Sequence, residues 1–265
     1  MNVFEGAKHM RYKIKEVTDE LVKRISVWET VEVITCTDAS TMDVYDPYFS
    51  ITLDVYYRKD GIPTGKKRQE SFTDTNFFEA STVSYKDRFM MEDFPVRVEY
   101  KELERIEHLI DSLDNPDSIY REKGTYIFHR LEEGIVLYEK TDWLKNIRKK
   151  LEKMPDRFWE IFREASQSRM EHYLSDLGAS VFQKDSLYYK ISLAGFLEYA
   201  CCTLFAINKK FEPSAKKFQE LIGKLPVLPA GFMASFDVLL RMDDNLSIER
   251  NREVAELLAK GIIGL

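Results

Sequence analysis

Two short stretches of alternating sequence constrain the fold of this chain more than any other feature. Across residues 50–57 the odd positions are apolar or aromatic, whereas Thr52 and Asp54 share the even positions. Residues 95–101 alternate in the same way, with Glu99 on the side opposite the valines. A period of two is typical of half-buried β-strands. We therefore expect two strands that each present a carboxylate to one face of a sheet.

The remaining pattern predicts an α+β protein in two parts. Residues 1–140 should form a small domain with a mixed sheet, and residues 141–265 a helical bundle. In the first part we expect helices at 8–28, 81–92 and 102–113, and further strands at 31–36 and 70–73. The apolar segments 126–131 and 134–138 flank Glu132 and Glu133 just before the helical part begins. In the second part we expect helices at 143–154, 155–177, 187–208, 214–222, 231–241 and 247–260.

Composition limits the functional classes. The chain has 265 residues and a net charge of −6, which argues against a general nucleic-acid-binding surface. Its three cysteines suggest neither a disulfide framework nor a zinc site, so we expect a cytoplasmic protein. The longest apolar run, 191–207, contains polar residues and is shorter than the ~20 residues of a membrane span, so it should be a buried helix.

The two acids suggest the sharpest chemical hypothesis. If the strands at 50–57 and 95–101 are neighbours, Asp54 and Glu99 can bind one divalent cation, because hard cations select oxygen ligands. A carboxylate on an alternating strand is, by itself, equally typical of the solvated side of a sheet.

This arrangement resembles the nucleotidyltransferase superfamily, in its kanamycin-nucleotidyltransferase-like branch, which shares the DNA polymerase β catalytic fold. The likeness rests on a small helix-strand-loop-strand unit with carboxylates on its central strands, followed by a helical domain. The segment Gly134-Ile-Val-Leu-Tyr138 followed by Trp143 also resembles the connection between the two domains of that branch. The resemblance covers most of the chain.

The resemblance assigns roles by position. Asp54 takes the place of the second acid of the motif and Glu99 that of the third, whereas Thr52 stands where the first acid is expected. The family's Gly-Ser loop is absent, and Ser40 and Thr37 are the candidate hydroxyls for phosphate contacts. Asp46 is the acid best placed to replace the missing carboxylate.

If the chain is an enzyme, the resemblance implies Mg²⁺ held by Asp54, Glu99 and Asp46. A nucleoside triphosphate would contact Ser40, Thr37 and Thr52, with Arg58 and Arg88 pairing with its phosphates. A hydroxyl of a small molecule or protein would attack the α-phosphoryl group, and pyrophosphate would leave. The alternative is a catalytically inactive member of the fold that binds a nucleotide or a protein. The sequence leaves both open.

Two features of the helical part are weaker candidates. Glu198 interrupts the apolar run and, if buried, must be paired or functional. Nearby aromatic residues, among them Tyr189 and Phe205, line either an acceptor pocket or, more commonly, a hydrophobic core.

Overall fold

The computed structural model describes residues 3–36, 49–59, 61–81, 85–111, 124–241 and 247–265. The chain divides into two compact units. Unit 1 comprises residues Met1–Ser112 and Arg130–Glu152, and unit 2 comprises Leu113–His129 and Lys153–Leu265. The predicted α+β class is confirmed, with a mixed sheet in the amino-terminal part and helices in the carboxy-terminal part.

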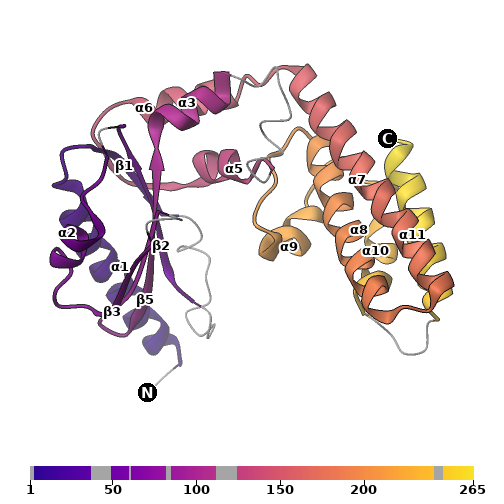
Figure 1. Cartoon of the computed structure of the whole chain (residues 1–265), viewed down its shortest axis with the longest axis horizontal. Helices are drawn as coiled ribbons and strands as arrows, with labels where there is room; N and C mark the ends of the chain where they lie inside the picture. The colour runs from indigo at the N-terminus through magenta and orange to yellow at the C-terminus, as the bar shows by residue number, and fades with distance from the viewer. Residues whose placement is uncertain (1–2, 37–48, 60, 82–84, 112–123, 242–246) are drawn as a thin grey trace. The chain divides into compact units, whose positions relative to one another are not determined.

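Unit 1 is built on a six-stranded mixed sheet in the order β3-β4-β5-β2-β1-β6 (Figure 1). The strands are β1 (Val31–Cys36), β2 (Ile51–Tyr57), β3 (Asn76–Ser81), β4 (Lys86–Met91), β5 (Phe94–Glu102) and β6 (Ile135–Glu139). Only β2 and β5 pair in parallel, and the other neighbours are antiparallel. The alternating stretches thus form the two adjacent strands at the centre of the sheet.

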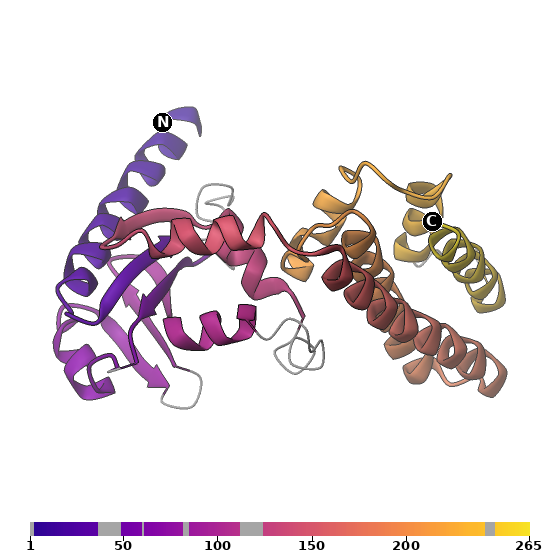
Figure 2. The ribbon, with the colours of Figure 1, turned by 90° about the horizontal axis from the view of Figure 1, so that it is seen from above.

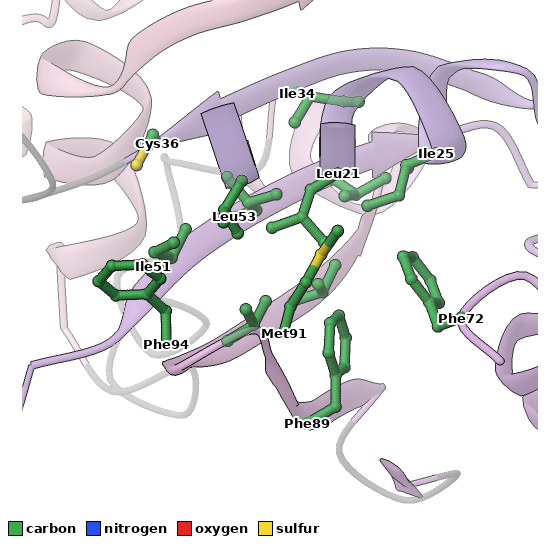
Figure 3. Close-up of a cluster of buried hydrophobic side chains, with 14 of the residues drawn as sticks. Leu21, Ile25, Ile34, Cys36, Ile51, Leu53, Phe72, Phe89, Met91 and Phe94 are labelled. Atoms are coloured by element: carbon green, nitrogen blue, oxygen red, sulfur yellow. The ribbon is translucent and has the colours of Figure 1, made fainter. Parts of the chain in front are cut away.

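One face of this sheet carries the hydrophobic core of unit 1. Helix α1 (Val3–Ser26) packs Leu21 and Ile25 against it, and both side chains are fully buried. Figure 3 shows these residues in one cluster with Leu53 of β2 and Phe89 of β4. Burial of a leucine or phenylalanine side chain contributes about 1.5–3 kcal/mol, so this packing fixes which face of each strand points away from the core.

The other helices of unit 1 are short. They are α2 (Gly65–Glu70), α3 (Leu103–Asp111) and α6 (Trp143–Leu151). Helix α5 (Tyr126–Glu133) crosses the division between the units, because the boundary falls between His129 and Arg130.

Two predicted elements of unit 1 are wrong. Residues 81–92, expected as a helix, contain β4, because Phe89 and Met91 are buried at a spacing of two. Residues 70–73, expected as a strand, contain the last residue of α2 and the turn that follows it. Residues 126–131, for which no element was predicted, lie in α5, whose Phe128 and Leu131 are buried at helical spacing.

Unit 2 is mainly helical (Figures 1 and 2). Its helices are α7 (Asp156–Gln183), α8 (Ser186–Ile207), the 3-10 helix η1 (Ala215–Lys217), α9 (Phe218–Ile222), α10 (Phe232–Arg241) and α11 (Ile248–Ile263). Helices α7 and α8 form a long antiparallel hairpin that shares a core with α10 and α11. Leu177, Phe196 and Ile222 are fully buried there.

Helix α8 has 22 residues and contains the whole of the apolar run 191–207, for which a buried helix was expected. Its most apolar window is 61% buried within the structure, as in the core helix of a soluble protein. Among the described residues, α8 is the one helix that meets the length and composition of a membrane span.

Candidate functional site: a charge cluster on the polar face of the sheet

The face of the sheet opposite the core carries the candidate site. We call it the polar face, and on the central strands it presents Thr52, Asp54, Arg97, Glu99, Lys101, Lys86 and Arg88. Asp54 of β2 and Glu99 of β5 are direct neighbours in the parallel register. Asp54 is fully buried, and Glu99 is 9% exposed. The two acids therefore meet on one face, as the alternation predicts.

Arg130 of α5 lies between the two acids. Its Nε donates to Asp54 Oδ2 at 2.8 Å, and its Nη2 donates to Asp54 Oδ1 at 2.5 Å. Its Nη1 donates to Glu99 Oε2 at 2.6 Å. The guanidinium side chain is only 8% exposed. The guanidinium group thus bridges two buried carboxylates. Its contact with Asp54 is bidentate, which is the geometry of the strongest charge-assisted hydrogen bonds.

Two lysines complete the cluster. Lys101 of β5 donates to Asp54 Oδ1 at 2.5 Å, and the ammonium of Lys86 lies 3.0 Å from Glu99 Oε1. Every oxygen of both carboxylates therefore contacts a cationic side chain. We call Asp54, Glu99, Arg130, Lys101 and Lys86 the charge cluster.

The cluster alters the protonation of its members. Burial would raise the pKa of Glu99, but Arg130, Lys101 and Lys86 outweigh that effect and lower its pKa to about 2. Burial lowers the pKa of Lys101, and Asp54 opposes this shift. Glu99 is consequently an anion throughout the physiological range and is poorly suited to act as a general base.

A divalent cation does not fit these residues as they are arranged. Magnesium needs carboxylate oxygens that are free to enter its coordination shell, whereas those of Asp54 and Glu99 are already paired with three cations. Within the described ranges, no group of three or more histidine, cysteine or acidic side chains is placed to hold a metal. We therefore assign no catalytic step to a metal at this cluster.

The proposed phosphate-binding residues are scattered. Thr52 is half-buried on the polar face, 3.3 Å from the Ser50 hydroxyl, and Arg88 is exposed on the same face. Arg58 instead pairs with Glu32 of β1 at 2.8 Å, away from the charge cluster. Thr37, Ser40 and Asp46 lie outside the described residues, so their roles stay predictions.

Sequence reasoning missed Arg130 and Lys101. No element was predicted for the segment that contains Arg130, although Ile127, Phe128 and Leu131 have the spacing of a helix. Lys101 shares the parity of Glu99 on β5, so the alternation already placed it on the polar face. A mid-helix arginine among apolar neighbours is the signal that could have been used, because a buried cation requires an anion.

A second buried acid lies in unit 2. Glu212 accepts a hydrogen bond from the Thr125 backbone N–H at 3.1 Å, and its own N–H donates to Thr125 Oγ1 at 2.9 Å. Burial raises the pKa of Glu212 to about 7, against the opposing effect of the Cys202 thiol. Gly124 has a φ of 83°, and a Cβ there would lie 1.8 Å from Glu212 Oε1. This close approach explains the glycine.

The structure also locates Glu198 and the aromatic residues near it in unit 2. Glu198 is exposed, so the expectation of a buried functional acid on α8 is wrong. Tyr189, Phe196 and Phe205 are buried in the core of unit 2, which is the more common role of such aromatic residues.

Comparisons with known proteins give two similarities. Residues 123–218 match a family described as a domain of unknown function, DUF4037. The chain is also similar to the crystal structure of a nucleotidyltransferase-like protein from Exiguobacterium sibiricum 255-15, with a TM-score of 0.48 and 9% identity. That similarity covers 95% of this chain and 74% of the other. A search of curated protein sequences gave no match. The family match includes both Arg130 and Glu212.

Proposed function

We propose that this chain is a catalytically silent nucleotidyltransferase-like protein that acts by binding a ligand on the polar face. The resemblance in sequence supports the fold, since Asp54 and Glu99 stand at the second and third acidic positions of the motif. Their register on neighbouring parallel strands agrees with that correspondence. Thr52 at the first acidic position removes one of the charges that two-metal catalysis requires.

The observation that carries this proposal is the position of Arg130. Its guanidinium occupies the space between Asp54 and Glu99, where a catalytic cation would bind. Removing a buried cation from two buried anions costs several kcal/mol. A metal would bind here only if its own interaction with the acids exceeded that cost. The acids therefore stabilise the fold, and the remaining groups of the polar face are available to a ligand.

The competing function is metal-dependent transfer of a nucleoside monophosphate to a small-molecule or protein hydroxyl. It would require Mg²⁺ to displace Arg130 and Lys101 from Asp54. The register of the two acids is what favours this alternative. Under it, Asp46, Ser40 and Thr37 would supply the missing ligands and phosphate contacts.

Pyrophosphate release distinguishes the two functions. The protein would be incubated with each nucleoside triphosphate, Mg²⁺ or Mn²⁺, and a mixture of hydroxyl acceptors, beside the Asp54→Asn variant. We expect the same background rate for both proteins, and no stabilisation by Mg²⁺ in thermal unfolding. Release by the unmodified protein that exceeds the variant's rate would overturn the proposal, as would metal-dependent stabilisation by a nucleotide.

A further inference from the structure

Helix α8 leaves one narrow stripe of its surface uncovered. Between Leu187 and Glu198 the exposed residues are Leu187, Lys190, Ile191, Ala194 and Glu198. Their spacing of three and four places them on one side of the helix, because an α-helix has 3.6 residues per turn. The opposite side lies in the core of unit 2. We call these five residues the α8 stripe.

The first half of the α8 stripe is strongly apolar. Leu187 is 69% exposed and Ile191 is 56% exposed, and they lie on successive turns of the helix. Leu197, which is half-buried, extends the apolar surface beyond Ala194. Scattered apolar side chains are normal on a protein surface, whereas a contiguous strip is typical of an interface. The α8 stripe is therefore a candidate docking surface for another protein chain.

The charges of the α8 stripe indicate which chain fits it. Lys190 lies four residues before Ala194, and Glu198 lies four residues after it. Neither forms an ion pair with any residue that the structure describes. They cannot pair with each other, because eight residues span about 12 Å along a helix. The stripe thus has opposite charges at equal distances on either side of one small residue.

A second copy of α8 in antiparallel orientation complements this arrangement. If the two helices cross at Ala194, Lys190 of each copy lies level with Glu198 of the other, and Ile191 lies level with Leu197. Alanine at the crossing point lets the helix axes approach to about 8–10 Å. A two-fold axis forms every contact twice, so this self-complementary pattern is what a symmetric dimer requires.

From this complementarity we infer that the chain forms a homodimer in which α8 packs antiparallel against α8 of a second copy, about a two-fold axis at Ala194. Two ion pairs between Lys190 and Glu198 flank the crossing point, and Ile191 becomes buried. The inference concerns unit 2 alone and goes beyond the proposed function, because it does not depend on ligand binding at the polar face of unit 1.

Sedimentation of the full chain over a micromolar dilution series tests the dimer. We expect the unmodified protein to dimerise, and Lys190→Glu or Glu198→Lys to weaken the dimer about tenfold, since each replaces two ion pairs by two like-charge contacts. The double variant Lys190→Glu with Glu198→Lys should regain the affinity of the unmodified protein, because the ion pairs are restored with reversed sign. Lys66→Glu is the control for the change of charge, since Lys66 is an exposed cation of α2 in unit 1, and it should leave the affinity unchanged.

A cysteine at the crossing point tests the register of the two helices. In Ala194→Cys the two thiols face each other at the axis, close enough for a disulfide, and mild oxidation should link the two chains. Leu187→Cys is the matched control, because position 187 lies seven residues from the axis. Its two copies are about 21 Å apart along the helices and should not cross-link. The three native cysteines are buried, so they should not react.

Three results would overturn the inference. The first is a monomer throughout the micromolar range. The second is a dimer whose affinity is unchanged by both charge reversals or is not regained in the double variant. The third is cross-linking of Leu187→Cys as efficient as that of Ala194→Cys. Because the substituted positions are exposed, the circular dichroism spectra of the variants should match that of the unmodified protein, which separates loss of the dimer from loss of the fold.

Discussion

A single guanidinium holds the two central acids of this sheet together. Arg130 contacts both Asp54 and Glu99, and its side chain is almost completely buried. Each partner depends on the others, since an unpaired charge at this depth would be far more costly than an unpaired polar group. The residue is therefore more important to stability than an ordinary surface arginine.

Replacing Arg130 with alanine should lower the free energy of unfolding by about 3–5 kcal/mol, because two buried acids lose their shared partner. Urea denaturation measures the loss. Arg157→Ala is the matched control, because the ion pair that Arg157 makes within the described residues is with the exposed Glu160 of its own helix, and it should have little effect. We also expect Mn²⁺ to stabilise Arg130→Ala more than the unmodified protein. Equal stability of Arg130→Ala and Arg157→Ala would contradict the role given to the cluster.

Glu99 should make stability fall in acid. Its pKa is lowered from 4.5 to about 2, so its contribution is complete above pH 4.5 and is lost as the pH falls toward 2. The contribution is on the order of 3 kcal/mol. Denaturation of the protein and of Glu99→Gln at pH 6 and pH 3 isolates it, because the other carboxyl groups titrate in both. The stability difference between the two proteins should shrink at pH 3, and a constant difference would count against the lowered pKa.

Glu212 should have the opposite dependence. Its pKa is raised to about 7, so the folded state binds the proton more tightly than the unfolded state. The contribution is complete below pH 4.5 and is lost as the pH rises through 7. Glu212→Gln keeps the acceptor for the Thr125 N–H but cannot ionise. Thermal unfolding should therefore show Glu212→Gln gaining stability relative to the unmodified protein between pH 5 and pH 8. No relative gain would mean that Glu212 ionises normally.

At the scale of elements, the two-residue period of apolar and polar side chains predicted the strands that position the site. The alternation of apolar and polar residues predicted β2 and β5 with nearly the observed bounds, and the run of β-branched residues predicted β1. The errors fell on short segments. Residues 81–92 are too short to separate a helix from the β3–β4 hairpin by spacing, and β4 is defined by its pairing with β5. Helix α5 was missed for the same reason, and Arg130 was missed with it.

Helix α2 is fixed to the sheet by a buried ion pair on the core side. Arg68 donates to both oxygens of Asp87 on β4 at 2.8 Å, and the Tyr100 hydroxyl donates to Asp87 Oδ2 at 2.6 Å. Asp87→Ala should cost about 3–5 kcal/mol, because Arg68 would stay buried without an anion. Tyr100→Phe should cost about 1–2 kcal/mol, since it removes one hydrogen bond to a charged group. Chemical denaturation checks the order, and an equal cost for both would show that Asp87 is not the centre of this network.

At the scale of the whole molecule, each of the two units has a hydrophobic core of its own. Leu53 lies in the core of unit 1 and Leu177 in that of unit 2, and both are fully buried. The sequence indicated a sheet followed by helices, because the hydrophobic period changes along the chain. The predicted boundary after residue 140 left residues 130–140 in the first part but did not indicate that residues 141–152 also belong to unit 1.

Each core should therefore respond to its own substitutions. Leu53→Ala and Leu177→Ala should each cost about 2–5 kcal/mol. Hydrogen exchange followed by mass spectrometry should show faster exchange in strands of unit 1 for Leu53→Ala and in helices of unit 2 for Leu177→Ala. A uniform increase over both units in either variant would show that the two cores unfold as one.

The order of residues in the charge cluster also bears on how the protein is made. Arg130 follows Asp54 by 76 positions and Glu99 by 31, so a ribosome delivers both anions well before the cation that joins them. Until α5 emerges, only Lys86 and Lys101 can offset the two acids, and the central strands of the nascent sheet lack their closing contact. The cluster therefore cannot be completed until about half of the chain has been made, and a chain that stalls before residue 130 lacks the cation that pairs with both central acids.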